Sequence, residues 1–365
     1  MDGAASDIAG GMSRRGWLAF AAMSAIWGVP YLFIKIAVDG GAPPAGVAWA
    51  RVTLAGAVLL ALAARAGTLR SLQGRMRWVA AVAVAEIAIP FPAVAYAERH
   101  LSSSTAAILI ASVPLLIALL SLRFEEAERP TRLRLAGLVT GFAGVVALVG
   151  IDLSQRPGEL PGVLAALAAA GGYAVGPLLL KRHLLALDPR ATMGGCLGVA
   201  ALLLTPAAVL TAPARWPSEG SLLSIAVLGL LCTALAFVIF NVLIAETGPS
   251  RSSVITYVNP VVAVALGVAL LGERPGAGAV AGLLLILAGS WLSTDGRLPP
   301  GLARLRAARS RPRRRAAAGS GGDAPGWTRT SNPRLRRPAL YPVELQGPAT
   351  IFARAAPIRR TANRT

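Results

Sequence analysis

The sequence Trp27-Gly28-Val29-Pro30-Tyr31-Leu32-Phe33-Ile34-Lys35 has a counterpart 146 residues later, in Tyr173-Ala174-Val175-Gly176-Pro177-Leu178-Leu179-Leu180-Lys181. Each stretch begins with an aromatic residue and ends with a lysine. Two further features recur near the same spacing. A proline followed by an apolar run and Glu-Arg-Pro occurs in residues 114–130 and 260–275, and Ala-Gly-Leu with a later Ala-Gly occurs in 136–144 and 281–289. Three features in one order indicate an internal repeat rather than chance similarity.

The composition predicts an integral membrane protein. Hydrophobic residues make up 55% of the 365 residues, charged residues only 15%, and the mean hydropathy is +0.61. A helix needs roughly 20 apolar residues to cross the hydrocarbon core. Apolar runs of about that length predict an all-α protein with ten transmembrane helices at residues 16–37, 43–64, 78–97, 103–122, 133–150, 160–180, 191–212, 221–245, 252–272 and 276–294.

The runs divide the chain into two five-helix repeats, 16–150 and 160–294, preceded by a short N-terminus (1–15) and followed by an Arg-rich tail (295–365). The first run follows Arg14 and Arg15 and is predicted to be a retained helix, because it is too long for the core of a signal peptide. Five is an odd number, so the second repeat enters the membrane from the opposite side. Such an inverted repeat gives a carrier two related conformations, each open to one side.

Positive charge predicts the orientation. With the N-terminus inside, the inner segments carry fourteen Lys or Arg residues and the outer loops carry four. Because cytoplasmic loops are enriched in Lys and Arg, both termini are predicted to be cytoplasmic.

The chain resembles the EamA-type carriers of the drug/metabolite transporter superfamily over residues 17–294. The resemblance rests on Trp27-Gly28, on Arg51, and on the duplicated proline, apolar run and Glu-Arg-Pro. It implies secondary transport in a bacterial inner membrane, commonly efflux of metabolites or amino acids. Tyr173 departs from the family pattern, which would have Trp there, and this leaves the substrate open.

Prolines and glycines predict different roles for the spans. Prolines in the interior of predicted spans free backbone carbonyls, which are tolerated beside a cavity or in protein. These are Pro30, Pro90, Pro92, Pro114, Pro177, Pro206 and Pro260. Spans 5 and 10 have none and carry Gly137-x-x-x-Gly141 and Gly278-x-x-x-Gly282. That spacing lets helices approach closely. We therefore expect spans 1–4 and 6–9 to surround a pathway, and spans 5 and 10 to be packing helices or the contact of a homodimer.

Charge inside a span is costly, so it is the best guide to a site. Glu86 lies near the middle of span 3, about eight residues or ~12 Å from the inner end. It could carry a proton or bind a cationic substrate, or be a structural glutamate paired with arginine. Arg51 lies ~10 Å from the outer end of span 2. It could bind a substrate carboxylate or neutralise Glu86, or snorkel to the interface.

Six further residues are candidates for binding or coupling. Trp27 and Tyr31 lie one turn apart on span 1 and could line a cavity or simply pack. The two lysines lie near span ends, where snorkelling is the ordinary explanation, although their equivalent places in the repeats keep a binding role open. In span 9, Tyr257 and Asn259 lie just before Pro260. The Asn259 side-chain amide could bind a ligand or satisfy the carbonyl that the proline frees. The set is Trp27, Tyr31, Lys35, Lys181, Tyr257 and Asn259.

The sequence argues against an enzyme. His100 and His183 lie in or beside loops of different halves, and no predicted span contains an aspartate, so no catalytic pair or metal cluster is expected. A Gly-x-x-x-x-Gly-Lys nucleotide loop is missing from the sequence. No cofactor or metal is predicted. A channel without a transport cycle remains the alternative.

The expected partners are a small-molecule substrate and membrane lipid, without nucleic acid. Glu128 and Glu273, at span ends, are predicted to stabilise loops. The tail beyond Arg297 has no structural period and resembles a spurious extension of the reading frame.

Overall fold

The structure is a computed structural model that describes residues 14–124, 131–155, 157–247 and 255–293. Within these ranges the chain is helical and has no strand. Its longer helical elements are α1 (Arg14–Gly28), α2 (Pro30–Asp39), α3 (Pro44–Arg65), α4 (Met76–Val82), η3 (Ala83–Ala88), α5 (Pro90–His100), α6 (Ser103–Ile110), α7 (Val113–Phe124), α8 (Arg132–Gln155), α9 (Leu160–His183), α10 (Pro189–Leu210), α11 (Glu219–Gly229), η5 (Leu230–Leu235), α12 (Ala236–Thr247), α14 (Ile255–Leu271) and α15 (Ala277–Ser293). The predicted tail, 295–365, lies outside the described residues.

These elements form the ten predicted spans. Among the described residues, eight helical runs are long and apolar enough to cross a membrane, from Gly16–Asp39 to Glu219–Leu243. Two shorter apolar helices, Ile255–Leu271 and Ala277–Ser293, follow them. Helices suit this composition because each satisfies its own backbone hydrogen bonds without water. The predicted all-α, ten-helix membrane fold is confirmed. We call the end of the bundle that carries Lys35 and His100 the Lys35 end, and the opposite end, which carries Lys181 and Asp188, the Lys181 end.

Two spans are distorted at the same place in the repeat. Elements η3 in span 3 and η5 in span 8 are both π-helical turns, and their first residues, Ala83 and Leu230, are 147 residues apart. Glu86 and Thr233 therefore occupy equivalent positions. π-Helical turns are rare and are found often at functional sites.

The prolines do not all interrupt their helices. Pro30 and Pro90 begin α2 and α5, directly after a helix break or a π-helical turn. Pro177, Pro206 and Pro260, by contrast, lie inside continuous helices. The first repeat is thus more broken than the second, although both carry prolines at related places.

The two repeats pack against each other in equivalent pairs. Span 2 (α3) packs on span 7 (α10), span 4 (α6) on span 9 (α14), and span 5 (α8) on span 10 (α15). The contact of α2 with α11 is matched by that of α9 with α5, and the contact of α1 with α14 by that of α9 with α6. Paired contacts of this kind are what an inverted repeat requires.

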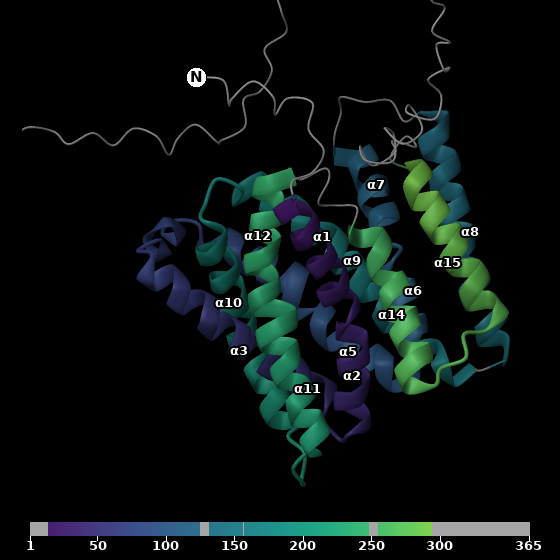
Figure 1. Ribbon diagram of the computed structural model, residues 1–365, viewed down its shortest axis with the longest axis horizontal. Helices are drawn as coiled ribbons and strands as arrows, with labels where there is room; N and C mark the ends of the chain where they lie inside the picture. The colour runs from purple at the N-terminus through teal and green to yellow at the C-terminus, as the bar shows by residue number, and fades with distance from the viewer. Residues whose placement is uncertain (1–13, 125–130, 156, 248–254, 294–365) are drawn as a thin grey trace, which may run out of the picture. The chain divides into compact units, whose positions relative to one another are not determined.

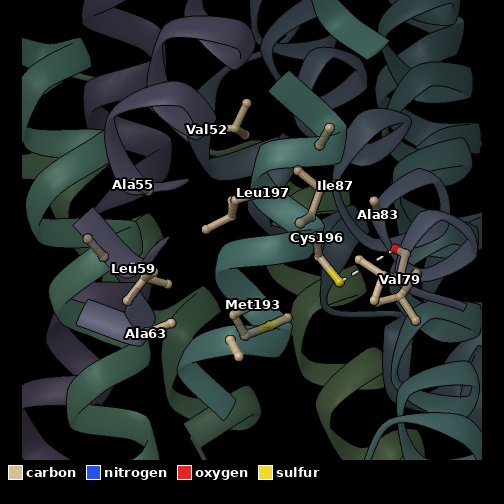
Figure 2. Close-up of a cluster of buried hydrophobic side chains, with 14 of the residues drawn as sticks. Val52, Ala55, Leu59, Ala63, Val79, Ala83, Ile87, Met193, Cys196 and Leu197 are labelled. Atoms are coloured by element: carbon tan, nitrogen blue, oxygen red, sulfur yellow. Dashed lines mark hydrogen bonds between the residues drawn. The ribbon is translucent and has the colours of Figure 1, made fainter. Parts of the chain in front are cut away.

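The core between spans 2, 3 and 7 is built from small and aliphatic side chains (Figure 2). Leu59 on α3, Ile87 on η3 and Leu197 on α10 are almost fully buried there, and the Cys196 Sγ lies 3.6 Å from the Val79 carbonyl oxygen. Lipid is as apolar as these side chains, so close packing rather than water exclusion stabilises such an interface.

The glycines of spans 5 and 10 are used inside one chain. Helices α8 and α15 lie side by side (Figure 1). A Cβ at Gly289 would overlap the backbone of Gly141, and one at Gly137 would lie 2.7 Å from the Gly289 carbonyl oxygen. The predicted packing role agrees with this arrangement. The predicted homodimer gains no support, because these glycine faces are occupied by each other.

Candidate functional site

Arg51 is held in one orientation inside the bundle. Its side chain is only 9% exposed, its Nε donates a 2.8 Å hydrogen bond to Thr233 Oγ1 on η5, and its Cζ lies 4.1 Å from the centre of the Phe91 ring on α5. The Thr233 hydroxyl in turn donates to the Leu228 carbonyl oxygen at 2.8 Å. Arg51 therefore joins span 2 to spans 3 and 8, and does not snorkel to the surface.

The rest of the guanidinium has no hydrogen-bond partner among the residues that the structure describes. Within the described part of the chain, only Nε of Arg51 makes a hydrogen bond, and the hydroxyls of Tyr31 and Tyr173 make none. Both tyrosines interact electrostatically with Arg51, and the Tyr173 ring centre lies 6.4 Å from that of Phe91. We call Tyr31, Arg51, Phe91, Tyr173 and Thr233 the Arg51 cluster. Several polar groups that lack partners and converge among aromatic rings are typical of a ligand site.

Glu98, which the sequence analysis did not single out, lies beside this cluster. Its side chain is fully buried, and neither carboxylate oxygen has a hydrogen-bond partner in the described structure. The charged groups that face it are Lys35, Asp39, Glu273 and Arg51. The predicted span 3 ended at residue 97, whereas α5 continues to His100. An acid just beyond an apolar run looks solvated in sequence, so only its burial reveals it.

Lys35 lies between Glu98 and the Lys35 end. Its Nζ donates a 2.8 Å hydrogen bond to the backbone carbonyl oxygen of Glu98 and forms a 3.2 Å salt bridge with Asp39. The lysine thus touches the main chain of Glu98 and leaves its carboxylate without a hydrogen bond.

Glu86 is half-buried, and it too has a buried carboxylate oxygen without a partner among the described residues. It lies on η3 against Gly176 of α9, and its Oε2 is buried and makes no hydrogen bond with any described residue. It forms no salt bridge with Arg51, which is bonded instead to Thr233, the equivalent of Glu86 in the second repeat. The alternative in which Arg51 neutralises Glu86 is therefore not found in this structure.

Trp27 and Asn259 lie together at a different contact. The Trp27 ring centre is 4.7 Å from that of Phe240, and a Cβ at Gly28 would lie 3.1 Å from the Asn259 carbonyl oxygen. The side-chain oxygen of Asn259 is buried and accepts no hydrogen bond from the described residues. Span 1 thus packs on span 9, at the contact of α1 with α14.

Two predicted site residues lie apart from the Arg51 cluster. The Tyr257 hydroxyl donates to the Ser290 carbonyl oxygen at 3.3 Å, which joins spans 9 and 10. Lys181 is exposed at the Lys181 end. Their positions match the packing and snorkelling explanations better than a binding role.

Glu273 links the two repeats. Its carboxylate accepts hydrogen bonds from Ser103 N (2.6 Å), Ser104 N (3.0 Å) and Ser104 Oγ (2.5 Å), at the start of α6. An acid at a helix N-terminus stabilises the unpaired amides there. The residue thus caps a helix of the other repeat, beyond the loop-stabilising role predicted from sequence. Glu128, its counterpart, lies outside the described residues.

A bundle of apolar helices with buried, unpartnered charges inside it defines a polytopic membrane transporter rather than an enzyme. Comparison with known proteins agrees: the sequence model of the EamA-like transporter family matches residues 14–150 and 160–294. The chain belongs to the EamA-like transporter family, within the drug/metabolite transporter superfamily.

Several relatives are named as transporters or exporters. The uncharacterized inner membrane transporter YedA of Escherichia coli K12 is 31% identical over 69% of this chain and 81% of its own length. A probable terminal-alkyne amino-acid exporter of Streptantibioticus cattleyicolor is 29% identical over 71% and 89%. The aromatic amino acid exporter YddG of Ancylobacter novellus is 30% identical over 50% and 63%.

A solved crystal structure that is 26% identical superposes with a TM-score of 0.56, covering 78% of this chain and 99% of the other. The chain is thus a multi-pass transporter of the bacterial inner membrane that carries small metabolites.

Proposed function

We propose that this transporter exports amino acids in exchange for protons, by alternating access. The observation that carries the proposal is the Arg51 cluster, in which a buried guanidinium fixed through Nε keeps both terminal nitrogens without a protein acceptor. A planar guanidinium presents these nitrogens as a fork that matches the two oxygens of a carboxylate. Exporters of amino acids among the relatives support the same substrate class.

Glu86 is proposed as the proton carrier. Its Oε2 is buried and makes no hydrogen bond with a described residue, and it lies on a π-helical turn that has an equivalent in the second repeat. Desolvation disfavours a charged carboxylate, so the group takes up a proton when it is enclosed and releases it when it faces water. In an exchange cycle, Glu86 accepts a proton on the outer side and releases it inside, while the amino acid moves outward.

Cytoplasmic termini are part of the proposal, because they place the Lys35 end outside and Glu86 nearer the cytoplasm. Fourteen positive charges on the inner segments against four on the outer loops support this orientation. Reporter fusions measure it. Fusions after Arg77, Arg134 and Arg190 should report cytoplasm, and those after Arg99 and Arg215 the outside. A mixed pattern would break the inverted topology.

The function is tested in proteoliposomes with equal potassium and valinomycin on both sides, which hold the membrane potential at zero. Labelled amino acids are offered outside, one at a time. With one proton exchanged per solute, a gradient of about one pH unit supports about tenfold accumulation, because one unit corresponds to about 1.4 kcal/mol. Accumulation is expected only when the lumen is the acidic side. Accumulation with an acidic exterior would indicate symport, and equilibration without accumulation would show that transport is not coupled to protons.

A further inference from the structure

Two buried groups of opposite charge, Arg51 and Glu98, lie near the Lys35 end of the bundle at similar depths. Arg51 is seven residues from the start of α3 at the Lys35 end, and Glu98 is two residues from the end of α5 at the same end. The difference of five residues corresponds to ~8 Å along the helices. Arg51 and Glu98 also interact electrostatically with each other, and Tyr31 interacts with both.

Neither charge is satisfied by the protein. The terminal nitrogens of Arg51 donate no hydrogen bond to a described residue, and both carboxylate oxygens of Glu98 are buried without one. Protonation does not remove the deficit at Glu98, because a carboxylic acid has a hydroxyl that needs an acceptor. Buried polar groups that lack partners are rare in native proteins and call for a specific explanation.

Lys35 does not supply that explanation in this conformation. It is the nearest cation, yet its ammonium is engaged by the backbone carbonyl oxygen of Glu98 and by Asp39. Asp39 and Glu273 add negative charge near Glu98, and Glu273 is fully engaged at the start of α6. The surroundings of Glu98 therefore favour a second cation.

We infer that Arg51 and Glu98 form one dipolar site, in which Arg51 binds the α-carboxylate and Glu98 binds the α-ammonium of a zwitterionic amino acid. The inference rests on the proposed function, and it specifies how the site recognises an amino acid, through the two oppositely charged groups that its Cα carries. Two charge-assisted hydrogen bonds of about 2.8 Å, with the amino acid's N–Cα–C unit between them, reach roughly as far as the ~8 Å difference in depth of the two residues along their helices. Phe91, Tyr31 and Tyr173 then lie around the zwitterion.

The site is tested by binding rather than transport, because amines and fatty acids cross bilayers unaided. Purified protein in nanodiscs is titrated with leucine, with 3-methylbutylamine, which lacks the carboxylate, and with 4-methylpentanoate, which lacks the ammonium. The corresponding series of phenylalanine, 2-phenylethylamine and 3-phenylpropanoate is run in parallel, and the thermal midpoint reports binding. Wild-type affinity should fall about tenfold to a hundredfold when either charge is removed, since hydrogen bonds to charged groups contribute that much.

We call the loss of affinity on removing the ammonium group the ammonium penalty, and the loss on removing the carboxylate the carboxylate penalty. Variants of Glu98 and Arg51 assign each penalty to one residue. In Glu98→Gln, the amino acid and its desamino acid should bind equally, so the ammonium penalty disappears while the carboxylate penalty remains. In Arg51→Gln, the reverse is expected. Glu219→Gln and Arg215→Gln remove the same charges at exposed positions and should keep both penalties. If Glu98→Gln does not fold, Glu98→Asp keeps the charge and shortens the side chain, and a smaller ammonium penalty is expected.

The outcomes separate this inference from the proposed function. Glu98 variants that keep the full ammonium penalty overturn the dipolar site, even if protons drive amino-acid transport. Variants that cancel one penalty each establish the site, even if the pH gradient drives nothing and the coupling proposal fails. If neither amino acid binds more tightly than its two analogues, the dipolar site is wrong for this chain.

Discussion

Proteoliposomes that contain Glu86→Gln are expected to accumulate no amino acid when the lumen is acidic, whereas wild-type protein reaches about tenfold per pH unit. Glutamine keeps the shape of a protonated glutamate but cannot release a proton. The two conformations then no longer differ in protonation, so the proton gradient cannot shift the equilibrium between them. Exchange of labelled for unlabelled amino acid across the membrane should continue, because binding at the Arg51 cluster is unchanged.

The comparison needs a control with the same change of charge. Glu219→Gln is a suitable control, because Glu219 is exposed in the first turn of α11 and lies outside the site. It should accumulate amino acid like wild type. Gradient-driven accumulation by Glu86→Gln at the wild-type level would show that another group couples transport. Loss of both accumulation and exchange, with the protein folded in the membrane, would place Glu86 in binding instead.

A single methyl group at Gly176 is expected to abolish the same coupling. A Cβ there would overlap Glu86 Oε2 and lie 2.8 Å from the Glu86 Cβ, so the carboxyl group must leave its present position. The overlap with the Cβ cannot be relieved by a rotamer change alone, and α9 or η3 must also shift. In Gly176→Ala, accumulation under a pH gradient should fall about as far as in Glu86→Gln, although the acid itself is still present.

Gly171 provides the matched control on the same helix, because a Cβ there meets nothing within 4 Å. Gly171→Ala should keep both accumulation and exchange. The amount of folded protein is measured for each variant by size-exclusion chromatography in detergent, since overpacking costs typically ~1–3 kcal/mol. Wild-type coupling in Gly176→Ala would mean that the position of Glu86 against α9 is unimportant, and the proton-carrier proposal would lose its geometric basis.

The interior charges divide into those that sequence could reveal and those that it could not. Arg51 and Glu86 stand out because a charged residue well inside an apolar run is costly. Their mutual pairing was one alternative, and tertiary structure decided against it by placing Thr233, from the second repeat, next to Arg51. A threonine in an apolar run carries no such signal, so this partner was not predictable.

Position near a span end gave no guide to burial. Glu98 and Lys181 both lie near the ends of their spans, yet Glu98 is fully buried and Lys181 is exposed. The difference arises from neighbouring spans: α2, α3 and α9 pack on α5, and Lys35 of α2 contacts the Glu98 carbonyl oxygen. Helical period places a residue on its own helix but says nothing about which other helix packs there.

The sequence by itself determined the all-α membrane fold, the ten spans and the two inverted repeats, because apolar length and an odd number of spans are local and countable properties. It also determined the family, through the order of its duplicated motifs. Tertiary structure alone decided that the glycines of spans 5 and 10 face each other within one chain, that Tyr173 joins Tyr31 and Phe91 around Arg51, and that Glu98 is buried. These are contacts between residues far apart in sequence, and the same apolar helices could have packed in many other ways, since lipid and protein interiors are almost equally apolar.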